Sequence, residues 1–330
     1  MTYPIYAGAL SALLTAVVGA MPGTSRAADA DYPSRPIRVV VPFPAGAGAD
    51  SNARLIGQKM AELLKQPVIV DNRPGANGMI GTEAVAKAAP DGYTMLFTDR
   101  GALGINPSLY KKLPYDPNKD FDYVGIAVWG PYILVANPKT PYTTLAGLSD
   151  FAKKNPGKIN YASFGNGSMT QIGTEMLSSA LGIQMTHVPY KGGAPALTAA
   201  MAGEVDIALI TIGPALGGLK EGRVKPLFVG TTTRLSILPD VPTAREAGVD
   251  PEAIPKTYFG FALPAGTPPA IVKTLSEAAR KAVSTPDVSA RLINAGFEPA
   301  TVSPQEMKAV VGRDVADFHK ITTRLGIQPE

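Results

Sequence analysis

The fold is decided by one stretch near the start of the chain, where a strand, a glycine-rich loop and a helix follow one another: IRVVVPFPAGAG, residues 37–48, then residues 49–65. Ile37–Val41 is a short apolar run rich in β-branched residues, which is typical of a buried strand. The residues after the loop repeat apolar side chains at helical spacing: Ala53, Ile56, Met60, Leu63 and Leu64. This alternation continues along the chain and predicts an α/β fold with parallel strands covered by helices on both faces.

The remaining elements suggest two domains. Strands are predicted at 68–70, 93–97, 160–163, 184–188 and 205–210, and helices at 80–88, 170–181, 194–201, 268–283 and 303–325. Two extended stretches, Val124–Val135 and Tyr258–Leu263, break the rhythm, and we interpret them as crossovers between domains rather than as strands of either sheet. Domain one would comprise residues 31–130 and 253–330, with its helical C-terminal portion packed back onto it, and domain two residues 131–252.

Residues 1–30 are predicted to be a cleavable secretory signal. An apolar run from Tyr6 to Met21 precedes two small-residue cleavage options, so the mature chain should begin between Ala28 and Asp31. The run is shorter than the ~20 residues that span a bilayer, which disfavours the alternative of a membrane anchor. The sequence has no cysteine, so a lipid anchor on an N-terminal cysteine is excluded. These features predict a soluble protein exported to the periplasm, and a monomer is expected.

Composition and motifs exclude several classes of function. Lysine and arginine are scattered rather than clustered, so the net charge of +4 does not indicate a nucleic-acid partner. The glycine pairs at Gly46 and Gly165 do not complete a dinucleotide motif, and neither a phosphate-binding loop nor metal-ligand spacing is present. No nucleophile motif occurs, and His187 and His319 are expected to be packed or surface residues. We therefore expect no cofactor, no metal and no enzymatic activity.

Four loops that follow predicted strands share glycine, small residues and hydroxyls. In an open α/β sheet the ligand sits at the carboxyl ends of the strands, where backbone N–H groups at helix starts favour anions. Each loop alone is more often an ordinary turn, and the prediction rests on their repetition in that position. The loops are residues 42–48, 98–101, 163–168 and 211–214.

Along the mature chain the following motifs occur in order: Pro42–Gly46 with Asp50, Asn72–Ala76, Asp91–Thr94, Asn106-Pro107, Ser163–Ser168, His187–Gly192, Gly203–Asp206 and Val241–Thr243. Together they resemble the Bug, or TctC, family of periplasmic solute-binding receptors. The resemblance implies a type II periplasmic-binding-protein fold, in which two α/β domains, each a mostly parallel sheet flanked by helices, close over one small ligand. Members typically bind carboxylates, and many serve tripartite tricarboxylate transporters.

The resemblance also implies which residues hold the ligand. One carboxylate would be held, partly through ordered waters, by both domains, with Thr98 at the wall of the site and Asp206 near its floor. Asp99 and Arg100, which follow Thr98, are also candidate ligand-binding residues. The loop residues concerned are Phe43, Ala45, Gly46, Ala47 and Gly48 from domain one and Ser163, Gly165, Asn166, Gly167 and Ser168 from domain two. The chain departs from the family pattern at Gly46–Asp50, at Thr98-Asp99-Arg100 in place of small hydroxyl residues, and at Gln171 in place of the usual histidine.

Arg100 bears on which carboxylate is bound. It follows Thr98 and Asp99 at the end of a predicted strand, where its guanidinium could pair with a second ligand carboxylate. The alternative is that Asp99 neutralises Arg100 at the surface. The leading hypothesis is capture of a small carboxylate, with a dicarboxylate favoured, for delivery to membrane transporter subunits. A periplasmic sensor of the same ligand is the alternative, and a hydrolase is disfavoured.

Overall fold

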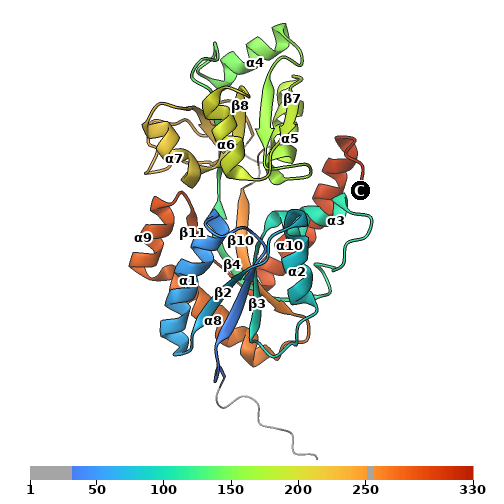
Figure 1. The fold of residues 1–330 in the computed structure, drawn as a ribbon, viewed down its shortest axis with the longest axis vertical. Coiled ribbons are helices and arrows are strands. Elements are labelled where there is room, and N and C mark those ends of the chain that lie inside the picture. The colour runs from blue at the N-terminus through green and yellow to red at the C-terminus, as the bar shows by residue number, and fades with distance from the viewer. Residues whose placement is uncertain (1–31, 251–253, 255, 330) are drawn as a thin grey trace, which may run out of the picture. The chain divides into compact units, whose positions relative to one another are not determined.

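The computed structural model describes residues 32–250, 254 and 256–329 of the chain. The predicted signal peptide and its cleavage site lie outside these residues. The described chain forms two mixed β-sheets flanked by helices, one of six strands and one of five (Figure 1). Among the described residues, no helix is both long and apolar enough to cross a membrane.

The six-stranded sheet combines three parallel strands from the start of the chain with three later strands. Its order is β11-β4-β10-β3-β1-β2. β1 pairs in parallel with β2 and β3, whereas β10 pairs antiparallel with β3 and β4, and β11 antiparallel with β4. The strands are β1 (Ile37–Val41), β2 (Val68–Asn72), β3 (Thr94–Asp99), β4 (Phe121–Gly130), β10 (Thr257–Pro264) and β11 (Glu298–Val302).

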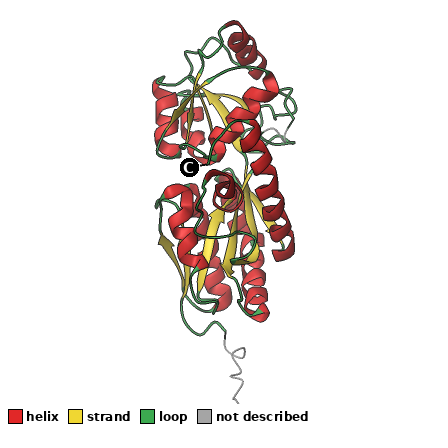
Figure 2. Ribbon diagram, turned by 90° about the vertical axis from the view of Figure 1, so that its right-hand side faces the viewer, coloured by secondary structure: helices red, strands yellow, loops and turns green. Residues whose placement is uncertain are grey.

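Helices cover both faces of this sheet (Figure 2). α1 packs against α8 on one face, and α2 and α10 lie on the other (Figure 1). α10 also contacts β4 and the π-helical turn η2, so the helical C-terminal portion packs back onto this sheet as predicted. The elements are α1 (Gly48–Leu64), η1 (Ala76–Gly78), α2 (Met79–Ala86), η2 (Gly101–Ile105), α3 (Asn106–Leu109), α8 (Pro269–Ser284), α9 (Pro286–Asn294) and α10 (Pro304–Arg324).

The five-stranded sheet has the order β7-β6-β8-β5-β9. β6 pairs in parallel with β7 and β8, and β5 pairs antiparallel with β8 and β9. The strands are β5 (Tyr132–Ala136), β6 (Asn160–Ser163), β7 (Thr186–Pro189), β8 (Ile207–Thr211) and β9 (Lys225–Val229), and the helices are α4 (Leu145–Lys154), α5 (Met169–Leu181), α6 (Gly193–Ala202) and α7 (Ile212–Lys220).

Alternating side chains of the strands of this second sheet enter two separate cores. Leu134 and Tyr161 pack with residues of α4 and α5, whereas their neighbours Ile133 and Ala162 pack with residues of α6 and α7. Successive side chains of a strand point to opposite faces, so a sheet covered on both faces needs apolar residues at nearly every position. This requirement explains the continuous apolar runs of the sequence.

The chain passes between the sheets at the two extended stretches, but these stretches are strands. β4 lies inside the six-stranded sheet, and β5 is the first strand along the chain that belongs to the five-stranded sheet. Only Pro131 separates β4 from β5. β10 lies near the middle of the first sheet, between β3 and β4. The two-sheet α/β fold is confirmed, whereas the expectation that these stretches belong to neither sheet is wrong. The crossing strands run antiparallel to their neighbours, which makes both sheets mixed.

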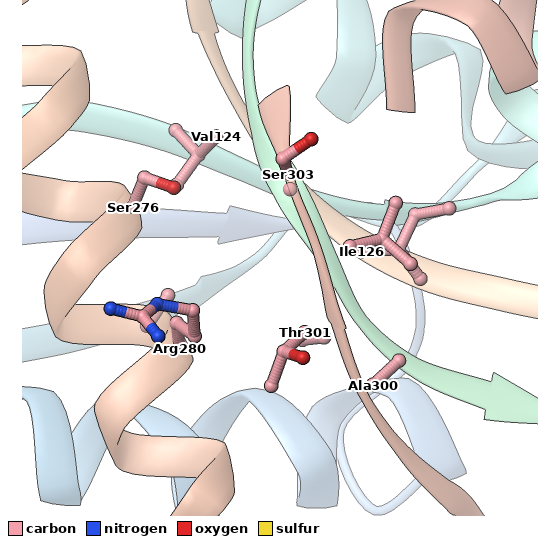
Figure 3. Close-up of a pocket in the computed structure, with 11 residues that line it drawn as sticks. Val124, Ile126, Ser276, Arg280, Ala300, Thr301 and Ser303 are labelled. Atoms are coloured by element: carbon pink, nitrogen blue, oxygen red, sulfur yellow. The ribbon is translucent and has the colours of Figure 1, made fainter. Parts of the chain in front are cut away.

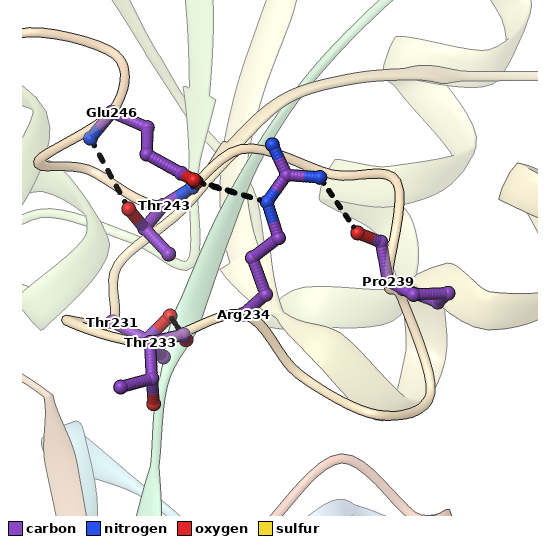
Figure 4. Close-up of polar contacts among 6 residues, drawn as sticks. All are labelled: Thr231, Thr233, Arg234, Pro239, Thr243 and Glu246. Carbon is purple, nitrogen blue, oxygen red and sulfur yellow. Dashed lines mark hydrogen bonds and ion pairs between the residues drawn. The ribbon is translucent and has the colours of Figure 1, made fainter.

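Side-chain hydrogen bonds fix the irregular segment that follows β9. Arg234 Nε pairs with Glu246 at 3.1 Å, and a guanidinium nitrogen of Arg234 donates to the Pro239 carbonyl at 2.9 Å (Figure 4). Thr243 Oγ1 accepts from the Glu246 backbone N–H, and the buried Thr231 hydroxyl donates to the Thr233 carbonyl (Figure 4). These contacts replace the backbone ladder that a strand would provide.

Candidate functional site

The four predicted loops all lie at carboxyl ends of strands. Residues 42–47 connect β1 to α1, and residues 164–168 connect β6 to α5. Arg100 alone separates β3 from η2, and α7 begins directly after β8 at Ile212. The sequence therefore located the ends of these strands to within two residues. The loops after β1 and β6 each lead into a helix long enough to carry a macrodipole.

The loop after β1 is held by a buried carboxylate. Asp50, in the first turn of α1, accepts from the Gly46 backbone N–H at 2.9 Å and from Asn72 Nδ2 at 2.9 Å. Asn72 Nδ2 also donates to the Phe43 carbonyl at 3.1 Å, and Arg54 Nε lies 2.9 Å from Asp50 Oδ1. The positions of Phe43 and Gly46 are thus set by side chains from α1 and β2.

The charge of Asp50 is stabilised in this network. Burial by itself would raise its pKa, but hydrogen bonds from Arg54, the Gly46 N–H and Asn72, together with the Arg54 charge, hold the pKa below its usual value. Asp50 is therefore ionised at neutral pH, and its carboxylate oxygens accept the hydrogen bonds that hold the loop. The backbone of Ala47, which precedes α1, is extended, and Ala47 provides no side-chain cap for the helix.

The loop after β6 is held by Ser163 and His187. Ser163 Oγ accepts from the Gly165 backbone N–H at 3.1 Å and lies 2.6 Å from His187 Nε2. The His187 ring stacks on Tyr161 at a centroid distance of 5.0 Å, and burial lowers the pKa of His187. The expectation of a packed histidine is confirmed at this position. Ser163 is fully buried, so its proximity to a histidine does not create an accessible nucleophile.

The same loop is completed by residues of α5. Gln171 Oε1 accepts from the Gly167 backbone N–H at 2.7 Å, and Ser168 caps α5 by accepting from the Gln171 N–H. Thr170 Oγ1 accepts from the Phe164 N–H at 2.9 Å. The residue that stands in place of the family histidine therefore holds the loop through its amide oxygen.

The loops of the two sheets touch each other. Asn77 of η1 donates through Nδ2 to the Asn166 carbonyl at 3.1 Å. A Cβ placed on Gly167 would clash with Leu109 of α3. The structure thus brings the loop after β6 against η1 and α3, which flank the six-stranded sheet.

Thr98 and Asp99 lie at the end of β3. Thr98 is fully buried, and its hydroxyl has no hydrogen-bond partner among the described residues. Asp99 accepts from the Ala102 N–H at 3.0 Å, and burial raises its pKa to about 6 although backbone N–H groups of Gly101 and Ala102 act in the opposite direction. Asp99 therefore directs its carboxylate to the start of η2.

Arg100 forms its ion pair with Asp314 of α10, and not with Asp99. Its Nε donates to Asp314 Oδ2 of α10 at 2.9 Å, with side-chain exposures of 13% and 11%, and a guanidinium nitrogen donates to the Lys256 carbonyl. The described structure shows no pair with Asp99, so the alternative of a surface Asp99–Arg100 pair is wrong. The partner that Arg100 does have lies 214 residues further along the chain.

Asp206 does not lie with the glycine-rich loops. It immediately precedes β8, and its Oδ2 accepts from the Asn160 N–H at 2.7 Å at the beginning of β6. Because β6 and β8 are parallel, this is the amino end of both strands, whereas Ser163–Ser168 follow the carboxyl end of β6. The expectation that Asp206 lies near the floor of the site is therefore wrong, and its role here is to fix the start of a strand.

The fourth predicted loop, residues 211–214, packs against the backbone of another segment. A Cβ on Gly213 would lie 2.6 Å from the Ala295 carbonyl oxygen, and a Cβ on Gly296 would lie 2.8 Å from Ile212. Thr211–Pro214 therefore packs tightly against the segment between α9 and β11. Glycine is required there for close approach rather than for contact with a ligand.

A pocket of about 110 Å³ lies apart from the predicted site (Figure 3). Its walls come from α8, β4 and β11, where β11 breaks register with β4, and include Arg280, Thr301 and Ser303. None of the predicted binding residues lines it. Within the part of the chain that the structure describes, no group of three acidic or histidine side chains could hold a metal ion.

Sequence reasoning missed several residues that hold the loops. Asn72, His187 and Asn106 stood in recognised motifs but received no role, and Asn77 lay just beyond one. A signal existed for Asn77, since asparagine between Ala76 and Gly78 favours left-handed backbone. No local signal identifies His187 as the partner of Ser163, because that contact depends on the pairing of β6 with β7.

Comparison with known proteins agrees with this architecture. The family model for the tripartite tricarboxylate transporter family receptor, TctC, matches residues 52–327. A UPF0065 protein of Bordetella pertussis is 38% identical over 301 residues, which cover 91% of this chain and 92% of that protein.

Two solved structures are similar over nearly their whole length. An R. palustris protein solved with adipate is 33% identical, with a TM-score of 0.84, and the match covers 91% of this chain and 100% of that one. MatC from Rhodopseudomonas palustris with bound malate is 34% identical, with a TM-score of 0.78, and the match covers 88% and 99% of the two chains. The chain therefore belongs to the TctC family of tripartite tricarboxylate transporter receptors, which are periplasmic solute-binding proteins and not enzymes.

Proposed function

We propose that this receptor binds a small dicarboxylate between the loop after β1 and the loop after β6, and passes it to the membrane subunits of a transporter. The proposal includes export with removal of residues 1–30. It also includes two domains, residues 31–130 with 253–330 and residues 131–252, that close on the ligand. The observation that carries it is the Asn77–Asn166 hydrogen bond, which joins the loop after β6 to the turn after β2, and that turn packs against Pro42 of the loop after β1.

The charge of the ligand would be met mainly by backbone N–H groups and hydroxyls. Among the predicted residues only Arg100 is cationic, and it is already bonded to Asp314. The starts of α1 and α5, with Ser168 at the second, offer N–H groups and a favourable macrodipole. Two helix starts on two sheets suit a ligand with a carboxylate at each end, and adipate and malate, bound by the relatives, are such ligands.

A thermal-shift comparison tests the number of carboxylates. Malate, adipate and adipic acid monoamide would each be added to the mature protein over a range of concentrations. A ligand present at one hundred times its dissociation constant adds about 2.7 kcal/mol of stability. A dicarboxylate should raise the melting temperature clearly, and the monoamide, which lacks one charge at the same length, should do so far less. If no dicarboxylate of four to eight carbons raises the melting temperature, the proposal fails.

A further inference from the structure

The segment PGANG, residues 74–78, contains an unusual backbone turn that the binding site does not explain. Gly75, Ala76, Asn77 and Gly78 all have positive φ, at 133°, 46°, 49° and 82°, and the Gly78 N–H donates to the Gly75 carbonyl at 3.0 Å. Left-handed backbone raises the conformational energy of a residue with a Cβ by roughly 1–2 kcal/mol. Asparagine tolerates this conformation, so the cost falls mainly on Ala76, and alanine adopts it where the surroundings impose it.

The surroundings hold this turn from two sides. Asn106 Nδ2, which is buried, donates to the Asn77 backbone carbonyl at 3.0 Å and to Tyr115 Oη at 3.1 Å. A Cβ on Gly78 would lie 3.4 Å from Pro42, the first residue of the loop after β1. The turn is therefore braced against both α3 and the first predicted loop.

This backbone turn sets the direction of the Asn77 side chain. Asn77 uses both hydrogens of its amide, one toward Tyr110 Oη at 3.0 Å and the other toward the Asn166 carbonyl at 3.1 Å. Asn166 lies between Gly165 and Gly167, in the predicted binding loop of the other sheet. Gly167 in turn meets Leu109 of α3, directly beside Tyr110.

We propose that Asn77 is a latch that holds the loop of the five-stranded sheet in its ligand-binding position. The donor comes from one sheet and the acceptor is backbone of the other, so the contact forms without any ligand group. The latch stabilises the arrangement in which both loops face the same ligand, and so it determines affinity without touching the ligand. This inference rests on the proposed binding function for its effect on affinity, but not for the contact itself.

Two variants and one control test the latch. Asn77→Gly removes the amide while keeping a residue that accepts left-handed backbone, and Asn77→Asp keeps the shape but replaces the N–H donors with a carboxylate facing a carbonyl. Lys65→Gly is the matched control, since Lys65 is the other described non-glycine residue with positive φ, at 54°, and lies at the exposed end of α1. It relieves the same backbone strain without touching either loop.

Hydrogen exchange of the unliganded proteins is the deciding measurement. Asn77→Gly should speed exchange of residues 163–168 at least threefold, Asn77→Asp should do so more strongly, and Lys65→Gly should leave it unchanged. Equal exchange of this segment in wild type and Asn77→Gly overturns the latch. Adipate affinity by calorimetry is the second readout, with a loss of about two- to tenfold expected for Asn77→Gly, the range of one neutral hydrogen bond. Failure of the wild type to bind any dicarboxylate would refute the proposed function, while exchange still decides the latch.

Discussion

At the scale of single residues, glycine in the two binding loops has two separable roles. Gly46 and Gly167 have φ of 82° and 72°, yet space around them differs. Nothing lies within 4 Å of a Cβ placed on Gly46, whereas one on Gly167 would strike Leu109. Gly46 is therefore needed for backbone conformation alone, and Gly167 also for close approach between loops.

Substitution of Gly167 by alanine should reduce both stability and affinity. The control is Gly182→Ala, because Gly182 ends α5 with φ of 62° and has open space around it. Each variant should lose about 1–2 kcal/mol of stability to left-handed strain. Only Gly167→Ala should also weaken dicarboxylate binding by calorimetry, since its methyl group would disturb the contact between Leu109 and the loop after β6. Equal affinities for the two variants would show that Gly167 is an ordinary turn residue.

Asp50 should make the stability of the protein depend on pH. Its folded pKa is lowered, so its contribution is complete above the unfolded value near 3.8 and is lost as pH falls through the folded value. Asp50→Asn should cost about 1–3 kcal/mol at pH 7 by leaving buried donors unpaired. Urea unfolding measured between pH 7 and pH 3 should show the difference between wild type and variant shrink below pH 4. A difference that stays constant with pH would exclude the ionised carboxylate as its cause.

At the scale of elements, the Arg100–Asp314 pair joins the end of β3 to α10. Both side chains are largely buried, and removing one partner of such a pair costs about 3–5 kcal/mol. Arg100→Ala and Asp314→Ala should destabilise the protein by similar amounts, and the double variant by less than their sum. Both should change dicarboxylate affinity by the same factor. A tenfold loss of affinity in Arg100→Ala alone would show that Arg100 binds the ligand directly.

The sequence predicted elements well where their pattern is local. β6 was predicted at residues 160–163, where it is found, and α5 was predicted to within one residue of its start, because a loop of glycine and serine marks the boundary between them. β11 was missed, since EPATV has no strand pattern and becomes a strand only by pairing with β4. α4 was missed as well, although Thr144 caps it.

The misjudged strands and site residues share a physical cause. Membership of β4 and β10 in the first sheet depends on their pairing with each other, and their registered residues lie more than 120 positions apart, as for Thr257 and Gly130. Arg100 was placed correctly at the end of its strand, whereas Asp206 was predicted inside a strand and in fact precedes β8. Their partners, Asp314 and the Asn160 backbone, depend on how elements pack and not on local pattern.

At the scale of the whole molecule, the binding site is assembled from segments that are distant in the sequence. The loop after β1 is shaped by Asp50 and Asn72, and the loop after β6 by His187 and Gln171. Asn77, in the turn after β2 that packs against Pro42, is hydrogen-bonded to the loop after β6. Each loop is held from its own sheet, so a ligand bound to both would couple the motions of the sheets.

The most direct test of this account is hydrogen exchange with and without a saturating dicarboxylate, chosen as the one that raises the melting temperature most. The ligand should slow exchange in both loops together, at residues 43–50 and at residues 163–170, because backbone N–H groups of both sheets would bind the same molecule. Slowing confined to one loop, or found instead around the pocket that Arg280 and Thr301 line, would contradict it.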